Sequence, residues 1–417
     1  MKKLSVVVVV VALAASGEAK LTMVAPRDGE TVPLLWDKVK AFLDMPREAR
    51  KMNRLNISKA ESRSYREVRG ARPVEFAWTG DSNAVYRLSV RRLPDGRVFH
   101  EAVVTGCVAS LAGRLEIARE WEWTVSGSGE NAVGRFRTED RAPRIISLDG
   151  VSNARDIGGR IGLGGRRIKQ GLVLRTGGLN HNAKIDYYTY DEIMKMHEDG
   201  TLAAAGIGKS RGKGAEYEAK IRSGRKIDKD HLRLIKTAPS APGAERLSQA
   251  DREYLLDFIG VKSDIDLRDD WECYGMTGSP LGERVAFYHY HCQGAYGKFV
   301  TPVGRATAAQ VFSVLTEKKN YPVVFHCIGG TDRTGTFAYL LEGLLGVDEE
   351  DMIRDYEMSF ISAGGVDKRH LEWLERLVEA VHKLPGDTIA EKMERYFVSL
   401  GFTVDEVRSV REFLLEK

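Results

Sequence analysis

Residues 326–335 read HCIGGTDRTG and bring a thiol, a guanidinium and three glycines close together. The apolar run 321–325 before them predicts a strand, and the apolar run 337–345 after them predicts a helix. The chain between Cys327 and Arg333 must therefore turn tightly, which glycine allows. Backbone N–H groups that converge in such a loop, at the start of a helix, stabilise a thiolate and bind phosphate. The sequence predicts a nucleophilic cysteine inside a phosphate-binding loop.

Each remaining position of this loop has an expected part in phosphoryl transfer. Arg333 can hold two phosphate oxygens at once through its planar fork, which lysine cannot do. The hydroxyl of Thr334 is placed to hydrogen-bond the sulfur when it leaves in the second step, and His326 fixes the loop from behind. The loop residues expected to surround the phosphate are His326, Ile328, Gly329, Gly330, Thr331 and Gly335.

The loop resembles the HCxxGxxRT signature of the cysteine-dependent protein tyrosine and dual-specificity phosphatases. Other strings resemble an atypical bacterial branch of tyrosine phosphatases, some of which act on phosphoinositides. They are N-x-R-D-I-G-G at 153–159, R-T-x-x-L at 175–179, D-L-R-x-x-x-E at 266–272 and a closing helix pair at 396–415. The resemblance covers about residues 145–415, in the same order. It implies a tyrosine phosphatase-like α/β sheet flanked by helices, a phosphocysteine intermediate, and no metal or other cofactor.

Two pairs of charged residues outside the loop are candidates for supporting it. Arg155 and Asp156 are expected either to form a buried ion pair that braces the loop from below, with Asn153 capping a turn, or to face the substrate. Asp266 and Arg268 lie two positions apart on a predicted strand, so their side chains share one face. They are expected in the ring around the loop, as bracing or as substrate-binding groups.

The general acid must be a carboxylic acid that gives a proton to the departing oxygen and then activates water. Asp332 is the first candidate, because the bacterial branch also carries Asp at this loop position. Asp266 and Asp269, at the end of a predicted strand, are the alternatives. Members of the branch that act on phosphoinositides often have Lys before this Asp, where this chain has Thr331. That difference argues against a multiply charged lipid headgroup.

The N-terminus has the pattern of a secretory signal peptide, in residues 1–19: two lysines, an apolar stretch and then small residues. The apolar stretch is shorter than the roughly 20 residues of a spanning helix, so we expect an exported protein with no stable membrane span after cleavage. A formal net charge of +4 suits anionic substrates, and no long basic run with interleaved aromatics indicates nucleic acid. Cys292 is expected to be either a plain buried thiol or a reversible partner for Cys327.

The 417 residues are long enough for two domains. Residues 20–72 are expected to be a linker with one helical pattern, and residues 73–143 a small antiparallel β-sandwich that resembles a fibronectin type III or immunoglobulin-like module. This module would space the enzyme, pack on it, or bind a surface or glycan partner. Residues 145–417 are expected to form the phosphatase domain. Its insertion, at about 180–246, would be a basic lid or a solvated excursion.

The sequence favours a phosphatase for phosphotyrosine, and also for phosphoserine or phosphothreonine, in a protein or a small phosphomonoester. The alternatives are a phosphoinositide or phytase-like inositol-polyphosphate phosphatase, and an inactive phosphate-binding module. Retention of Cys327, Asp332, Arg333 and Thr334 together argues against the inactive module. Residues 288–291, two tyrosines and two histidines, would line the mouth of the site or pack in the core.

Overall fold

The computed structural model describes residues 20–56, 70–127, 129–229, 232–240, 246–362 and 368–417. The predicted signal peptide, residues 1–19, lies outside them. The chain divides into two compact units, one formed by Met1–Trp36 and Ala71–Ala142 and the other by Asp37–Gly70 and Pro143–Lys417. Each unit therefore contains two separate stretches of the chain. No helix among the described residues is both long and apolar enough to cross a bilayer.

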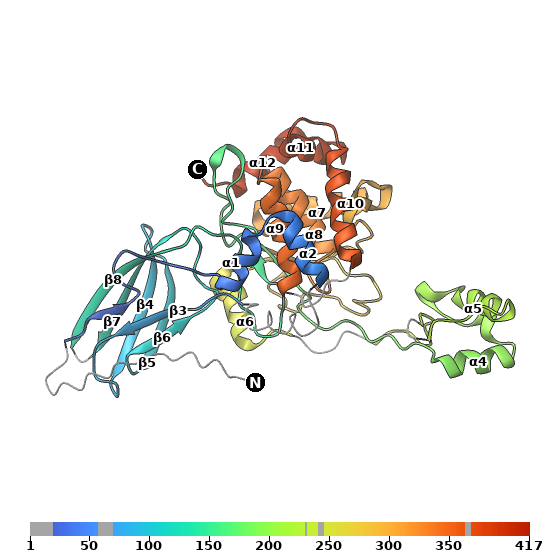
Figure 1. The fold of residues 1–417 in the computed structure, drawn as a ribbon, viewed down its shortest axis with the longest axis horizontal. Coiled ribbons are helices and arrows are strands. Elements are labelled where there is room, and N and C mark those ends of the chain that lie inside the picture. Colours follow the sequence, from blue (N-terminus) through green and yellow to red (C-terminus); the bar gives the residue numbers. More distant parts are fainter. Residues whose placement is uncertain (1–19, 57–69, 128, 230–231, 241–245, 363–367) are drawn as a thin grey trace. The chain divides into compact units, whose positions relative to one another are not determined.

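The first unit consists of two β-sheets (Figure 1). Aromatic side chains pack between them. Phe76, on one sheet, lies with its ring centroid 5.1 Å from Trp123 and 5.8 Å from Phe136, which belong to the other sheet. One sheet has the order β1-β3-β6 and the other β2-β8-β7-β4-β5. The strands are β1 (Met23–Ala25), β2 (Glu30–Val32), β3 (Val74–Trp78), β4 (Val85–Leu93), β5 (Val98–Thr105), β6 (Val108–Leu111), β7 (Glu120–Gly127) and β8 (Glu130–Thr138).

Strand β2 pairs in parallel with β8, so the larger sheet is not purely antiparallel as the sequence predicted. The likeness to fibronectin or immunoglobulin-like modules stays a prediction. Residues 20–72 also differ from the expected linker, because β1 and β2 add to the two sheets while α1 (Asp37–Asp44) and α2 (Arg47–Asn56) belong to the second unit. Burial explains this difference. In α1 the apolar side chains at positions 39, 42 and 43 are buried on one face.

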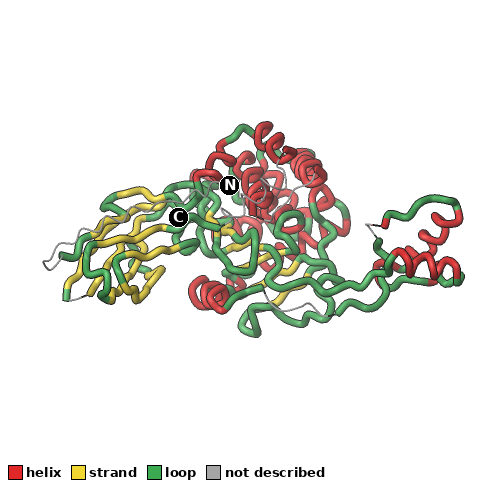
Figure 2. Tube along the Cα trace, turned by 60° about the horizontal axis from the view of Figure 1, so that its bottom comes forward, coloured by secondary structure: helices red, strands yellow, loops and turns green. Residues whose placement is uncertain are grey.

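The second unit is built on a six-stranded sheet with the order β13-β12-β14-β11-β10-β9. In Figure 2 its strands (yellow) lie among the helices (red) of this unit. The first four strands are parallel, and β10 and β9 continue the sheet in antiparallel pairing. The chain thus has the expected α/β class, and the strand that leads into the phosphate-binding loop, β14, is central. The strands are β9 (Arg144–Ile145), β10 (Arg155–Asp156), β11 (Val173–Thr176), β12 (Ser263–Asp266), β13 (Ala286–His289) and β14 (Val323–His326).

Helices cover both faces of this sheet. They are needed because apolar side chains of β14 point alternately to the two faces. Val323 and Phe325 point into the larger core, whereas Val324 points into the smaller core on the other side. The larger core involves α7 (Pro302–Thr316), α8 (Arg333–Leu344), α9 (Glu349–Ser362), α10 (Lys368–His382), α11 (Ile389–Ser399) and α12 (Val404–Leu414). The smaller core involves the π-helical turn Tyr254–Ile259, which continues α6 (Gln249–Glu253).

The insertion is a small folded element with its own core rather than a structureless excursion. Helices α4 (Tyr190–Glu198) and α5 (Lys213–Arg222) flank the short turns Leu202–Ala204 and Gly208–Ser210. Four buried side chains hold them together: Ile193, Leu202, Tyr217 and Leu234. Whether this element acts as a lid stays a prediction.

Candidate active site

The loop from Cys327 to Asp332 joins β14 to α8 at the carboxyl end of the central parallel strands, where ligands bind in open α/β sheets. Each carbonyl from residue 328 to 332 is held by a donor outside the loop or in the first turn of α8. The carbonyl of Ile328 accepts from the amide of Gly178 at 2.9 Å, and those of Thr331 and Asp332 accept from the amides of residues 335 and 336. The loop is therefore turned with its carbonyls outward.

The amides of the same loop have no such partners. Within the part of the chain that the structure describes, the backbone N–H groups of residues 328–331 donate to no protein acceptor. Buried N–H groups are normally paired, and a run of unpaired amides in a tight turn forms an anion-binding concavity. Gly330 allows this turn, because its φ is +68° and a Cβ there would lie 2.4 Å from the carbonyl oxygen of Thr176. This backbone is suited to hold a phosphate.

Two more carbonyls of the loop are held by side chains from the neighbouring motifs. Asn153 donates through Nδ2 to the carbonyl of Gly329 at 2.9 Å, and Arg175 donates through Nη2 to the carbonyl of Gly330 at 2.7 Å. Arg175 is fully buried, and Asp355 of α9 accepts from its other amino group. The N-x-R-D and R-T-x-x-L motifs thus brace the phosphate loop from behind.

The sequence suggested an ion pair between Arg155 and Asp156, but the structure gives each of them a different partner. Arg155 donates through Nε to Asp355 at 2.8 Å, whereas Asp156 accepts from Arg144 at 3.0 Å. The two residues are neighbours on β10, so their side chains leave on opposite faces of the sheet. Arg155 is 1% exposed and also donates to Asn153. Its contacts brace the loop through Asn153, and it does not line the cavity described below.

His326 directly precedes Cys327 and is completely buried. Its Nε2 is 3.0 Å from Asp264 and its Nδ1 is 3.8 Å from Asp266. Burial lowers the pKa of His326, but the two carboxylates outweigh burial and raise this pKa above its ordinary value. Nδ1 also donates to the carbonyl of Cys327 at 3.4 Å. A protonated His326 would therefore place positive charge next to Cys327.

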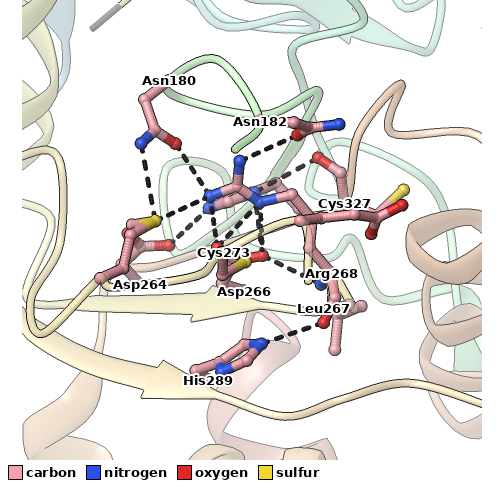
Figure 3. A network of polar contacts seen from close by, with 12 residues as sticks. Asn180, Asn182, Asp264, Asp266, Leu267, Arg268, Cys273, His289 and Cys327 are labelled. Carbon is pink, nitrogen blue, oxygen red and sulfur yellow. Dashed lines mark hydrogen bonds and ion pairs between the residues drawn. The ribbon is translucent and has the colours of Figure 1, made fainter. Parts of the chain in front are cut away.

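Asp266 and Arg268 form a closed set of contacts beside the loop, shown in Figure 3. The guanidinium of Arg268 donates to Asp266 at 2.6 Å, to Asn180 at 2.8 Å and to Asn182 at 3.1 Å. Both charged side chains are fully buried. Burial opposes ionisation of Asp266, but His326 and Arg268 hold its pKa well below the usual range. An ionised, enclosed Asp266 is better suited to bracing the loop than to proton transfer. Arg268 likewise braces the loop, because its donors are occupied by protein groups.

Arg333, at the start of α8, is held by the carboxylate of Glu272. Its Nη1 donates to Glu272 Oε2 at 2.7 Å and to the carbonyl of Leu267 at 3.2 Å. The same Oε2 accepts from the backbone amide of Asp269 at 2.7 Å. Glu272 was not among the site residues expected from the sequence, although the D-L-R-x-x-x-E string contains it. Its place in that string, six residues after Asp266 at the end of β12, was the available signal.

Arg333 opens onto a cavity of about 930 Å³ in the second unit. Two of the three candidate acids, Asp332 and Asp269, line this cavity, and Asp266 does not. Tyr296 faces Asp332: burial, followed by the nearby Tyr356 hydroxyl and the Asp332 carboxylate, raises the pKa of Tyr296 far above its ordinary value. The geometry therefore keeps Asp332 and Asp269 as candidates for the general acid.

The aromatic lining of the cavity comes from Trp271, Tyr296 and Trp373. Of residues 288–291, which the sequence offered for this place, only His291 lines the cavity, and Tyr288 and Tyr290 pack against the larger core. Tyr288 and Tyr290 are two positions apart, so in an extended chain their side chains point to the same face, towards the core.

The thiols and the loop hydroxyl complete the site. All four cysteines of the chain are free, and burial raises the pKa of Cys292 to about 11. Cys292 lines the cavity, whereas Cys327 is 3% exposed. The hydroxyl oxygen of Thr334 is buried and has no hydrogen-bond partner among the described residues. Its expected hydrogen bond to the Cys327 sulfur stays a prediction.

Comparison with known proteins agrees with this geometry over part of the chain. Residues 241–416 match the model of the tyrosine phosphatase family. A tyrosine-protein phosphatase of Nostoc commune is 31% identical over 133 residues, which are 27% of this chain and 45% of that protein. A protein of Cupriavidus necator whose name also includes tyrosine-protein phosphatase is 25% identical over 211 residues, 51% of this chain and 61% of its own length. The chain thus spans about half of these relatives, and its segment 241–416, which carries the phosphate loop, is similar to tyrosine phosphatases.

Proposed function

We propose that this protein is an exported, cysteine-dependent phosphatase that hydrolyses phosphotyrosine through a phosphocysteine intermediate, and that it also accepts phosphoserine or phosphothreonine. The observation that carries the proposal is the phosphate loop. Its carbonyls at 328–332 are turned outward, its amides at 328–331 have no acceptor among the residues that the structure describes, and Cys327 and Arg333 stand at its two ends. The names of the two relatives support the same activity.

The first step forms a bond between Cys327 sulfur and phosphorus while the bond from phosphorus to the leaving oxygen breaks. Arg333 and the loop amides bind the three outer oxygens, whose charge must be stabilised in the transition state. Asp332, with Asp269 as the alternative, gives its proton to the leaving oxygen. These two are preferred because both were candidates from the sequence and both line the cavity that the substrate would enter.

In the second step water attacks phosphorus, its proton passes to the same carboxylate, and the sulfur leaves as thiolate. Thr334 stabilises this thiolate with its hydroxyl. His326, Asp264, Asp266 and Arg268 act as positioning residues, because each is fully buried behind the loop.

A hydrolysis panel tests the proposal. Wild type and Cys327→Ser are compared in EDTA on phosphotyrosine and phosphoserine peptides, phosphoinositides and inositol hexakisphosphate. We expect phosphotyrosine to be the best substrate and the serine variant to be inactive. Turnover by Cys327→Ser, or a requirement for metal, would refute the mechanism. Asp332→Asn and Asp269→Asn, compared on good and poor leaving groups, identify the acid, whose loss matters most for the poor leaving group.

A further inference from the structure

One wall of the active-site cavity carries positive charge that the phosphate loop does not use. Lys298, from the turn Tyr296–Val300, and Arg376, from α10, line the same cavity as Arg333. Both side chains are exposed. Neither is in an ion pair with any carboxylate that the structure describes. Cations without an ion-pair partner beside a phosphate site attract a further negatively charged group of the ligand.

These two residues belong to elements that pack directly on each other. A Cβ added to Gly297 would lie only 3.0 Å from the carbonyl oxygen of Arg376, so the backbones are in close contact. The rings of Tyr296 and Trp373, from the same two elements, have centroids 4.9 Å apart. The cationic wall, defined as Lys298 and Arg376, is therefore carried by a fixed part of the second unit.

Two carboxylates of the cavity, Asp269 and Asp270, pair with a histidine and not with Lys298 or Arg376. Asp270 is 3.2 Å from Nδ1 of His291, and Asp269 is 3.6 Å from Nε2 of the same ring. His291 and these two carboxylates therefore form a charged group apart from Lys298 and Arg376. The cationic wall stays open to a ligand.

The size of the cavity indicates a ligand that extends beyond the reacting phosphate. Its volume of about 930 Å³ lies near the upper end of the roughly 300–1,000 Å³ found for ligand pockets. A single phosphorylated aromatic ring would leave much of it uncovered. A peptide segment fills such a space and brings its own charged side chains. A compact polyphosphate would be held better by a second cation in the loop itself, and position 331 is Thr.

We propose that Lys298 and Arg376 bind acidic residues next to the phosphorylated residue of a peptide substrate. The proposal rests on the phosphatase function proposed above and gives it a sequence preference. Exposed ion pairs are individually weak, each changing affinity by a factor of up to about five. Two of them would favour an acidic peptide over a neutral one by about tenfold.

The test compares phosphotyrosine peptides that differ only in flanking residues: glutamates, alanines or lysines. For wild type we expect kcat/KM to be about tenfold higher with glutamates than with alanines, and the ratio to shrink in high salt. Lys298→Ala/Arg376→Ala should bring the ratio close to one, mainly through KM. Lys298→Glu/Arg376→Glu should prefer the lysine peptide. Lys319→Ala, which removes a cation that is 79% exposed and not in the cavity, is the matched control and should keep the wild-type ratio.

Equal kcat/KM for the glutamate and alanine peptides in wild type would overturn this proposal, and so would an unchanged ratio in the charge-reversed variant. If Lys298→Ala/Arg376→Ala lost activity only on inositol hexakisphosphate or phosphoinositide vesicles, the cationic wall would be assigned to a polyphosphate instead. Failure of the function itself is distinguishable, since wild type would then hydrolyse none of the phosphotyrosine peptides. Binding of the same peptides to Cys327→Ser, followed by fluorescence anisotropy, tests the charge preference independently of turnover.

Discussion

Glu272→Gln tests whether the guanidinium of Arg333 must be held in place before the substrate arrives. The substitution keeps the size of the side chain and an acceptor oxygen but removes the negative charge that lies 2.7 Å from Arg333 Nη1. Hydrogen bonds to charged groups are worth about 1.5–3 kcal/mol. The two partners are 17% and 18% exposed, so solvent screening places the loss towards the lower end of this range. At about 1.4 kcal/mol for each factor of ten, we expect kcat/KM to fall by roughly 10- to 50-fold.

The assay is steady-state hydrolysis of p-nitrophenyl phosphate and a phosphotyrosine peptide, with thermal unfolding measured in parallel. Glu283→Gln, an exposed glutamate of the same unit, is the control and should retain wild-type rates. A misplaced Arg333 weakens transition-state binding, so we expect the fall in both kcat and kcat/KM while the variant stays folded. A folded Glu272→Gln protein with kcat/KM within twofold of wild type would refute this reasoning about Arg333.

Three further changes probe the support of the loop. Asp355→Asn removes the carboxylate shared by buried arginines and should cost about 3–5 kcal/mol in urea unfolding; a loss under about 1 kcal/mol would contradict the network. Burial, followed by Asp355, raises the pKa of Glu342 above 4.5, so the folded state keeps a proton that the unfolded state loses as pH rises. Glu342→Gln should therefore gain stability relative to wild type as pH rises above about 5, and a pH-independent difference in unfolding free energy would count against this. Asn153 has a φ of +62° and donates to the carbonyl of Gly329. Asn153→Ala should therefore lose about 1–3 kcal/mol of unfolding free energy, and Asn153→Gly, which tolerates this backbone conformation, should lose less. Equal losses would show that the left-handed backbone is not the cause.

The phosphate loop and its two flanking elements could be predicted because their determinants are local. The apolar run before His326, the glycines and the helical run after Arg333 lie within about twenty-five residues. The structure places β14 at Val323–His326 and begins α8 at Arg333, as the sequence indicates. Asp266 and Arg268 do lie together, but not for the predicted reason: β12 ends at Asp266, and Arg268, two residues later, turns back to form an ion pair with it.

The partners of the buried charges could not be predicted in the same way. Arg155 binds Asp355, 200 positions later in the chain, and no local pattern links the two. The adjacent Asp156 was the plausible partner in the sequence, but β10 sends the two side chains to opposite faces. The fate of residues 20–72 was equally non-local, since Arg50 is buried by ion pairs to Glu350 and Glu357 of α9. Long-range pairing decided each of these features.

The orientation of the loop explains why so many buried charges lie behind it. A tight turn could place either its carbonyls or its amides in the centre, and only the amides attract an anion. Asn153 and Arg175 donate to consecutive carbonyls at Gly329 and Gly330, and they can do so only while those carbonyls face away from the centre. Asp355 keeps the arginine in that position by an ion pair removed from water. The network thus acts on phosphate binding through the direction of the peptide groups, although none of its charged members lines the active-site cavity.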